Sequence, residues 1–406
     1  MNRVLYLVMA GGRGERLRPL TDYCPKPLLR FGPSGRVIDF TLYNCLASGG
    51  GDVVVLTQYL SDMVKGYLGV KWGPAFSEQG TRLEILAGKR AQKGGYRGTA
   101  DAVYQALKMR DDSSEEYVVV LAGDHVYQMD YWHMIRFHQL HGGQATVGAV
   151  ECDPSEAYRF GIIKSRDDGK ILSFHEKPRG IKRIVPPGKK PLASMGIYVF
   201  TKKYLMDCLE IIRKDGFYDF GKYVLPEMAA SGEAWTYIFL QPDGTAGHWR
   251  DIGDLLSYWQ SHMELLNGGC NDLYSSSSPF GNPAHGLMEP PLSAVHLIRE
   301  QENGARRIRN SLVSENARIE GALVNNSVIG PGVHIEDDAL VLRSVILDGA
   351  VIRRNARVLD SVVEPLVTVN SGWQSGPQRG LRATHAKTEE GMPPISINSA
   401  RGSHST

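Results

Sequence analysis

The stretch VLYLVMAGGRGERLRPLT occupies positions 4–21 and joins an apolar run to a Gly-rich, basic turn. The run Val4–Met9 is continuously apolar, which predicts a buried strand. Gly11, Gly12 and Gly14 follow at once, and glycines after a strand let backbone N–H groups approach phosphate oxygens closely. We therefore expect an α/β fold whose first strand ends in a phosphate-binding loop.

The spacing of this loop excludes two other phosphate motifs. The chain contains no GxxxxGK(S/T) sequence, and a dinucleotide GxGxxG motif begun at Gly12 fails because Leu17 stands at its third glycine position. A plain tight turn is the alternative interpretation. Arg16, Arg18 and Lys26 follow the glycines and favour phosphate binding, because they would supply the compensating positive charge.

The first half of the chain alternates short apolar runs with amphipathic stretches. This pattern predicts βαβ units and a Rossmann-like domain with a mostly parallel, mixed sheet. Further strands are expected at Asp52–Thr57, Tyr117–Leu121 and Ala145–Val150, and helices at Ile38–Ser48 and Thr99–Met109. Ligands in such sheets bind beyond the carboxyl ends of the strands, which lie here at Gly11, Gln58 and Gly123–Asp124.

The second half changes character twice. Leu266–Pro291 is rich in Gly, Ser, Asn and Pro, so we expect a linker over residues 266–305 after a catalytic domain at 1–265. Apolar residues then recur every six positions, with one slip, at Ile329, Ile335, Val341, Ile346, Ile352 and Val358. This period predicts a short left-handed parallel β-helix of hexapeptide repeats at 306–369, with a small β-sandwich as the alternative. Residues 370–406 lack apolar periodicity and are expected to be disordered.

Composition narrows the class of protein. The 406 residues suggest two domains, and 46 Lys and Arg against 44 Asp and Glu lack the basic excess of a nucleic-acid-binding protein. The five cysteines are scattered without a CxxC pair, which favours neither a disulfide framework nor a zinc site and fits a reducing cytosol. The apolar start is too short for a signal peptide, and no segment reaches the ~18 apolar residues of a membrane span. We expect a cytoplasmic protein that binds neither nucleic acid nor membrane.

Four further stretches carry a specific resemblance. They read YRGTADAV at 96–103, AGDHVY at 122–127, ASMGIYVF at 193–200 and HWRDIG at 248–253. Together with the loop at 11–27 they resemble the glucose-1-phosphate adenylyltransferase family of sugar nucleotidyltransferases, from about residue 4 to 260 and more weakly through the repeats. The resemblance implies transfer of a nucleotidyl group from a nucleoside triphosphate to a sugar 1-phosphate, with release of pyrophosphate.

The resemblance also implies a role for individual residues. Asp124 and Asp251 would hold the catalytic Mg²⁺, which prefers carboxylate and phosphate oxygens, and Arg16 and Lys26 would act beside them. Nucleotide contacts fall on Gly11, Gly12, Gly14, Gly98 and Thr99, and sugar-phosphate contacts on Tyr96, Gly161, Glu176, Lys177, Ser194 and Asp219. A helix N-cap is the alternative for Asp124, a surface ion pair for Glu176 and Lys177, and a core position for the neighbouring Phe220.

Two departures from the family leave the substrates open. In the family a glutamine recognises adenine, but Leu86–Arg90 contains no clear counterpart of it, unless a gap in the alignment places Gln92 there. The lysine that binds the activator in the family is also absent from Phe31–Arg36. Two substrate pairs therefore stay open: ATP with glucose 1-phosphate, or GTP with valienol 1-phosphate, a glucose-like cyclitol of antibiotic biosynthesis.

Alternatives from other classes also stay open. A noncatalytic regulatory subunit would keep the scaffold, and an acyltransferase would need a histidine in the repeats, where His334 is the candidate. Nucleotidyl transfer needs no general base, because a phosphate monoester has a second pKa near ~6, so His125 is expected either to pack in the core or to support the residues that contact the reactants. The solvent-facing ends of a short β-helix need caps or a partner subunit, and short β-helices of this family help to form dimers or tetramers, so the resemblance implies a homo-oligomer.

Overall fold

The computed structural model describes residues 4–32, 35–49, 51–88, 95–110, 114–241, 243–266, 295–303, 306–314, 316–375 and 395–397. The chain divides into two compact units. The first comprises Met1–Gly12 and Phe40–Trp249, and the second comprises Arg13–Asp39 and Arg250–Thr406. This division differs from the boundary expected at residue 265, because the segment Arg13–Asp39 belongs with the C-terminal half.

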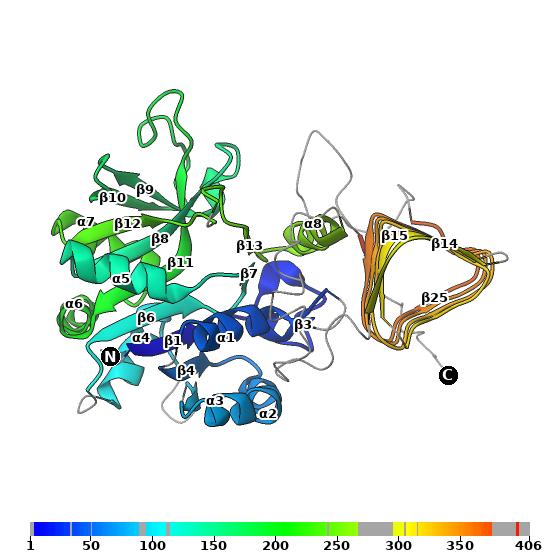
Figure 1. Ribbon diagram of the computed structural model, residues 1–406, viewed down its shortest axis with the longest axis horizontal. Helices are drawn as coiled ribbons and strands as arrows, with labels where there is room; N and C mark the ends of the chain where they lie inside the picture. Colours follow the sequence, from blue (N-terminus) through cyan, green and yellow to red (C-terminus); the bar gives the residue numbers. More distant parts are fainter. Residues whose placement is uncertain are drawn as a thin grey trace, which may run out of the picture. The chain divides into compact units, whose positions relative to one another are not determined.

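A nine-stranded mixed sheet forms the centre of the first unit (Figure 1). Its strands run in the order β10-β9-β11-β6-β1-β4-β5, with β8 against β11 and β12 against β8. The pairs of β1 with β4 and β6, of β4 with β5 and of β8 with β12 are parallel. The bounds are β1 (Val4–Met9), β4 (Asp52–Thr57), β5 (Leu83–Ala87), β6 (Tyr117–Ala122), β8 (Ala145–Glu151), β9 (Gly161–Ser165), β10 (Ile171–Glu176), β11 (Leu192–Thr201) and β12 (Ala234–Ile238). The four strands expected from the sequence are confirmed, as is the mixed character of the sheet, in which β11 pairs antiparallel with β6, β8 and β9, and β9 pairs antiparallel with β10.

Helices cover both faces of this sheet, which explains why its central strands are apolar throughout. Leu5 and Leu7 of β1 join a core that includes Val103 and Leu107 of α4 (Thr99–Lys108). The alternate residue Tyr6 faces the other way, and its ring centroid lies 5.9 Å from that of Tyr131 in α5 (Tyr131–His141). Because successive side chains of a strand point to opposite faces and both faces are covered, Val4–Val8 of β1 are all buried.

The other α-helices of the described residues have 6 to 13 residues each. They are α1 (Val37–Ala47), α2 (Ser61–Lys71), α3 (Gly73–Glu78), α6 (Lys202–Lys214), α7 (Leu225–Ala230) and α8 (Leu255–Leu266), the last in the second unit. The helices expected at Ile38–Ser48 and Thr99–Met109 are confirmed as α1 and α4. Within the described ranges, none of the helices combines the length and apolarity that a bilayer span requires.

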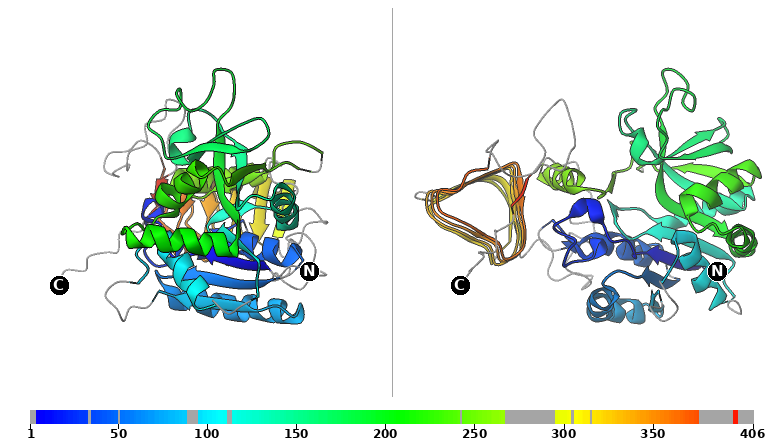
Figure 2. Two further views of the ribbon diagram at one scale, coloured as in Figure 1. Left: turned by 90° about the vertical axis from the view of Figure 1, so that its left-hand side faces the viewer. Right: turned by 180° about the vertical axis from the view of Figure 1, so that it is seen from behind.

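The second unit contains a three-sided parallel β-helix, which Figures 1 and 2 show as a stack of coils. Its sides are built by β17 (Leu323–Asn325), β20 (Leu340–Leu342) and β23 (Arg357–Leu359), by β18 (Val328–Ile329), β21 (Val345–Ile346) and β24 (Ser361–Val363), and by β16 (Arg318–Ile319), β19 (His334–Ile335), β22 (Val351–Ile352) and β25 (Thr368–Val369). β15 (Arg306–Ser314) pairs with both β17 and β18. The expected parallel β-helix is confirmed, and the β-sandwich alternative is wrong.

The first coil, from Ser311 to Ser327, takes 16 residues, and the next two, from Ser327 to Ser344 and from Ser344 to Ser361, take 17 residues each. This is one residue fewer than three six-residue repeats require, and the missing residue is the slip between Val341 and Ile346 in the sequence pattern. Val341 and Ile346 both lie in the buried core of the β-helix.

One corner of the β-helix is closed by a ladder of serines. Residues with a left-handed backbone precede the serines, at Asn310, Asn326, Arg343 and Asp360. The N–H groups of Ser327, Ser344 and Ser361 each donate to the Oγ of the serine one coil earlier, at 3.1, 3.1 and 3.2 Å. Each of these Oγ atoms in turn donates to a backbone carbonyl two residues upstream. A backbone N–H that bends out of the strand ladder thus keeps a partner.

Two regions outside the expected repeat range also form strands. β14 (Val295–Asn303) lies inside the range 266–305 for which we expected a linker, and it pairs antiparallel with β15. β26 (Ile395–Ile397) lies inside the expected tail and pairs with β24. Both corrections have the same cause: the edge strands β15 and β24 offer unpaired backbone groups, which a segment of weak sequence pattern can satisfy.

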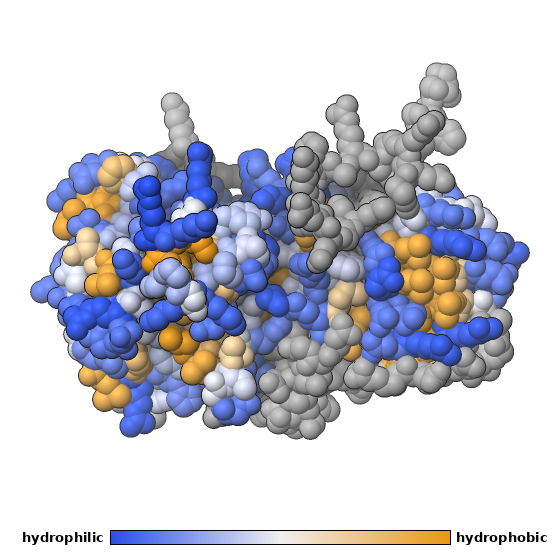
Figure 3. All heavy atoms as spheres, turned by 90° about the horizontal axis from the view of Figure 1, so that it is seen from above, coloured by the Kyte–Doolittle hydropathy of each residue, from blue (hydrophilic) through white to orange (hydrophobic). Residues whose placement is uncertain are grey.

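Apolar residues also point outward from the β-helix, and Figure 3 shows apolar surface there among hydrophilic residues. Leu323, Leu340, Leu342 and Leu359 are half-buried at the outer positions of β17, β20 and β23. Inner and outer positions therefore share apolar side chains, so the sequence alone distinguishes the inner set by its spacing and not by its hydrophobicity.

The serine ladder generates a stability prediction. Ser344→Ala should destabilise the β-helix by about 1–3 kcal/mol, because the buried N–H of Ser361 would lose its acceptor. Ser371→Ala is the matched control, since the exposed Ser371 Oγ only donates to Arg354 O at 2.7 Å. Differential scanning calorimetry and amide exchange at Ser361 measure the effect. Equal unfolding midpoints and equal exchange in the two variants would contradict the ladder.

Candidate active site

The ends of β1 and β6 meet at the carboxyl edge of the sheet. The N–H of Gly123 donates to Met9 O at 3.0 Å, and a Cβ on Gly123 would lie 3.0 Å from Val8 Cγ1, so only glycine fits closely there. Gly11 follows β1, and a Cβ on it would lie 3.4 Å from the Cβ of Gln58 at the end of β4. The three strand ends expected to bound a ligand site are thus neighbours.

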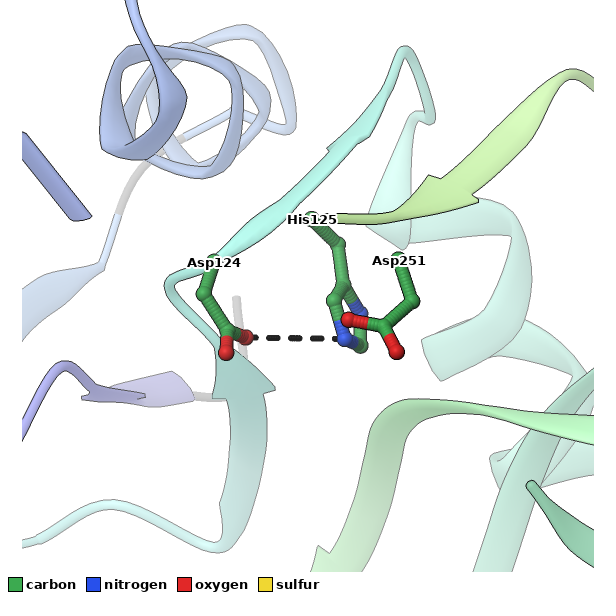
Figure 4. A group of neighbouring side chains, drawn as sticks. All are labelled: Asp124, His125 and Asp251. Carbon is green, nitrogen blue, oxygen red and sulfur yellow. Dashed lines mark ion pairs between the residues drawn. The ribbon is translucent and has the colours of Figure 1, made fainter. Parts of the chain in front are cut away.

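Asp124, His125 and Asp251 come together just beyond this edge (Figure 4). Each offers one potential ligand atom, and these atoms lie within 4.8 Å of one another. β7 (His125–Tyr127) pairs with β13 (Trp249–Asp251), which brings the two aspartates near each other. Asp124 precedes a strand and not a helix, so the alternative that it is a helix N-cap is wrong.

The imidazole of His125 is fixed by its neighbours. Its Nδ1 lies 3.0 Å from Met195 O, to which it must donate because a carbonyl oxygen only accepts. Its Nε2 lies 3.5 Å from Asp124 Oδ1, and its ring meets that of Trp249 edge-on with centroids 5.1 Å apart. His125 thus contacts an aromatic ring and a backbone carbonyl, and its Nε2 faces Asp124.

Two cationic side chains approach Asp251. Lys26 Nζ lies 3.4 Å from Asp251 Oδ1, and Lys26 is only 8% exposed, so its ammonium is a buried charge that needs this carboxylate. A Cβ on Gly253 would lie 2.9 Å from Asp251 Oδ2 and 3.3 Å from Arg16 Nη2, which puts the exposed Arg16 beside the same carboxylate. Gly14 has φ +64, a conformation that favours glycine, and a Cβ there would lie 3.1 Å from Lys26 Cβ.

A second group of expected site residues surrounds Glu176, at the end of β10. Gly161 pairs with Glu176 across β9 and β10, and a Cβ on Gly221 would lie 2.6 Å from Glu176 Oε2. Lys177 Nζ lies 3.3 Å from Glu176 Oε1, so the ion pair given as the alternative does exist. Lys177 has φ +46, a strained conformation that turns the chain directly after the strand.

Tyr198 links further members of this group. Its hydroxyl lies 3.3 Å from Ser194 Oγ, and its ring stacks on Phe220 with centroids 5.9 Å apart. Burial raises the pKa of Tyr198, and the charges of Glu176 and Asp219 raise it further. Glu176, Ser194 and Asp219 thus lie around one buried tyrosine. Phe220 is buried in the core, which is the alternative given for it.

The start of α4 and the residues before it are held by contacts with backbone atoms of other segments, which involve Tyr96, Gly98 and Thr99. The Tyr96 hydroxyl donates to Leu86 O at 3.2 Å, and burial, reinforced by Asp101, raises the pKa of Tyr96 to about 12. The Thr99 hydroxyl accepts the Phe220 N–H at 2.9 Å, and a Cβ on Gly98 would lie 2.2 Å from Tyr218 O. These contacts join the loop that carries Tyr96 to the segment that carries Asp219. Gln92, the candidate for reading the base, lies outside the described residues.

Several neighbours of the site escaped the sequence analysis. Met195 acts through its carbonyl, Gly221 through its lack of a side chain, and Tyr198 through burial. None of these roles has a residue signature, although Met195 and Tyr198 fall inside a stretch that carried the family resemblance. His334, the acyltransferase candidate, instead pairs with Glu320 at 3.1 Å on the β-helix.

Comparison with known proteins agrees with this geometry. The family model described as nucleotidyl transferase matches residues 5–268, and the model described as GlmU-like, C-terminal hexapeptide matches residues 293–392. The glucose-1-phosphate adenylyltransferases of Fervidobacterium nodosum and Pasteurella multocida are each 35% identical, over 93% and 92% of this chain and 86% of either relative. That of Rhodopirellula baltica is 32% identical over 100% of this chain and 94% of its own length.

The chain belongs to the glucose-1-phosphate adenylyltransferase family of nucleotidyl transferases. It is therefore an enzyme of the nucleotidyltransferase class, and the alternatives of a noncatalytic subunit and an acyltransferase are set aside.

The loop segment of this nucleotidyltransferase that carries Lys26 is fastened to α8. The N–H of Gly32 donates to His262 Nε2 at 3.1 Å, and His262 Nδ1 donates to Tyr258 O at 2.8 Å. Burial lowers the pKa of His262 from its ordinary value of 6.5 to about 4. The imidazole is therefore neutral near pH 7 and can accept from Gly32.

This histidine generates a pH prediction. Its folded pKa lies below its unfolded pKa, so its stabilising contribution is complete above pH 6.5 and is lost as the pH falls toward about 4. The change amounts to about 3 kcal/mol at most. His262→Gln, which keeps an acceptor for Gly32, should flatten the stability profile between these pH values, whereas exposed His133→Gln should not. Urea unfolding at several pH values measures the slope, and the slope left in His262→Gln is assigned to His138, whose pKa burial also lowers to about 4.

Proposed function

We propose that this enzyme joins ATP to glucose 1-phosphate, forming ADP-glucose and pyrophosphate. The observation that carries the proposal is the meeting of Asp124, Asp251 and Lys26 at the carboxyl edge of the sheet. The relatives, named glucose-1-phosphate adenylyltransferase, support the choice of substrates. The neighbouring group around Glu176 supplies polar and charged side chains suited to a phosphorylated sugar.

The chemistry needs positioning more than proton transfer. A nonbridging oxygen of the sugar 1-phosphate attacks the α-phosphorus of the nucleotide, and the bond from that phosphorus to the pyrophosphate oxygen breaks. The attacking oxygen is already anionic near neutral pH, because the second pKa of a phosphate monoester is about 6. No general base is required, so the packed position of His125 is consistent with this reaction.

The charged residues of the site would neutralise the phosphates. Asp124 and Asp251 present hard carboxylate oxygens of the kind that Mg²⁺ prefers, so this donor set fits a magnesium ion. Such an ion would offset negative charge on the phosphate oxygens. Lys26 and Arg16 beside Asp251 would add positive charge on the nucleotide side, and the backbone of Gly11, Gly12 and Gly14 would line the phosphates.

The Glu176 group would bind the sugar 1-phosphate. Glu176 and Asp219 can accept hydrogen bonds from sugar hydroxyls, and the ammonium of Lys177, with its side chain 58% exposed, can bind the phosphate. Ser194, Gly161 and Tyr96 would complete the pocket by contact. Gly98 and Thr99 would contribute to the nucleotide side through the entrance of α4.

Asp124→Asn and Lys26→Ala should each lower turnover roughly a hundredfold or more. Removal of one electrostatic contact of this kind typically raises a barrier by about 3–4 kcal/mol. Asp167→Asn is the control, because Asp167 is fully exposed and pairs with the exposed Lys189 at 3.6 Å. Pyrophosphate release in a coupled assay measures turnover. Near-normal release by either variant would contradict the assigned role.

The substrates are tested by a panel of ATP, GTP, UTP and dTTP against several sugar 1-phosphates. We expect the highest kcat/KM with ATP and glucose 1-phosphate. Turnover confined to GTP or to a cyclitol 1-phosphate would contradict the adenylyl assignment and leave nucleotidyl transfer intact. No release with any pair would contradict catalysis itself.

Three further properties stay predictions. They are assembly into a homo-oligomer, a cytoplasmic location, and the absence of nucleic-acid and membrane binding. The absence of the activator lysine supports one more, namely that sugar phosphates do not activate the enzyme.

A further inference from the structure

The segment that carries Lys26 makes a charged contact with the β-helix. Arg30 Nη2 lies 2.5 Å from Asp348 Oδ2, and Arg30 Nε lies 3.1 and 3.2 Å from Asp348 Oδ1 and Oδ2. The two side chains are 18% and 35% exposed, so water screens this pair only partly. Because two N–H groups of one guanidinium bind one carboxylate, the pair fixes the orientation of the Arg30 side chain as well as its distance from Asp348.

The surroundings hold both partners of this pair in place. Tyr258 OH in α8 donates to Arg30 O at 2.6 Å, so the backbone of Arg30 is anchored together with its side chain. Asp348 follows β21, and a Cβ on Gly330 would lie 3.1 Å from Asp348 Oδ1. The glycine of the preceding coil thus leaves the room that the carboxylate occupies.

A short, buried stretch of chain connects Arg30 to Lys26. Lys26–Leu28 forms a single helical turn, closed by the bond from Leu29 N–H to Lys26 O at 3.1 Å. Leu28 and Leu29 are 3% and 4% exposed, so the three positions between Lys26 and Arg30 have little freedom to bend. A displacement of Arg30 therefore moves Lys26.

The partner of Lys26 is fastened to the same β-helix. Asp251 lies a few residues before α8, whose Trp259 Nε1 donates to Arg343 O at 2.7 Å on the β-helix. The two side chains that meet at the Lys26–Asp251 pair thus reach the β-helix by separate routes, one through Arg30 and one through α8.

We propose that the Arg30–Asp348 pair is a positioning device, through which the β-helix holds Lys26 in register with Asp251 for nucleotidyl transfer. The inference rests on the proposed function, because it takes Lys26 and Asp251 as members of the catalytic group. Neither Arg30 nor Asp348 touches the reactants. A misplacement of about 1 Å by a distant group can cost a large factor in rate, so loss of the pair should reduce turnover more than affinity.

The test compares Asp348→Asn with Glu336→Gln in the full-length enzyme. Glu336 pairs with the Arg353 side chain and accepts the Arg354 N–H at 3.0 Å, both within the β-helix, so its loss weakens the β-helix without touching the segment of Lys26 or the contact of Trp259 with Arg343. We expect Asp348→Asn to lower kcat about tenfold with both KM values within about twofold, and Glu336→Gln to leave kcat unchanged. Asp348→Glu, which keeps a carboxylate, should recover most of the lost kcat.

Amide hydrogen exchange gives a readout independent of turnover. Exchange at Leu28 and Leu29 should accelerate in Asp348→Asn and not in Glu336→Gln, whereas amides of the β-helix core should be unaffected by Asp348→Asn. Unchanged exchange at these two amides would overturn the proposal, as would faster exchange with normal kcat. Equal loss of kcat in both variants would also overturn it, since that would reflect β-helix stability alone. An inactive wild-type enzyme would instead contradict the proposed function, and the exchange result would still decide whether Asp348 orders the segment.

Discussion

Negative charge is the constraint on which this structure depends. Two carboxylates, Asp124 and Asp251, lie near each other, and the family reaction adds two phosphorylated reactants to the same place. Like charges so close repel strongly where water is partly excluded. The buried ammonium of Lys26 offsets part of this charge on Asp251, and it needs Asp251 for the same reason, because a buried cation without a partner is costly. The glycine loop, the sheet edge and the anchors of Lys26 all serve to keep this arrangement in place.

The sheet and the β-helix could be predicted because their sequence patterns are local. β1 is buried on both faces and is therefore apolar at every position, whereas the β-helix repeats its inner residues at nearly constant spacing. The division of the chain into units could not be predicted in this way. Arg30 and Asp348 are 318 positions apart, and nothing in the sequence near either residue indicates the other. Segment Arg13–Asp39 therefore looked like part of the first domain.

The residues of the candidate site also differ in whether the sequence near them predicts their role. Asp124, Asp251 and Lys26 could be found from motifs, because their side chains carry the chemistry and their neighbours resemble a family. Tyr198 and the carbonyl of Met195 could not, since a buried ring and a backbone oxygen act through position alone. The strands β14 and β26 were also missed, because they are defined by the edges that they pair with and not by a pattern of their own.

The 17-residue coil has a consequence for how such a chain can change its length. Ile329, Ile346 and Val363 stack in register, so Pro331 and Pro365 occupy the positions above and below Asp348 in the neighbouring coils. Deleting or duplicating one whole coil upstream of Asp348 would preserve every rung of the stack, yet it would set a proline opposite Arg30. The number of coils before Asp348 is therefore fixed by the contact with Arg30. Coils added after Asp348 leave this contact intact, whereas coils added or removed before it replace Asp348 by another residue.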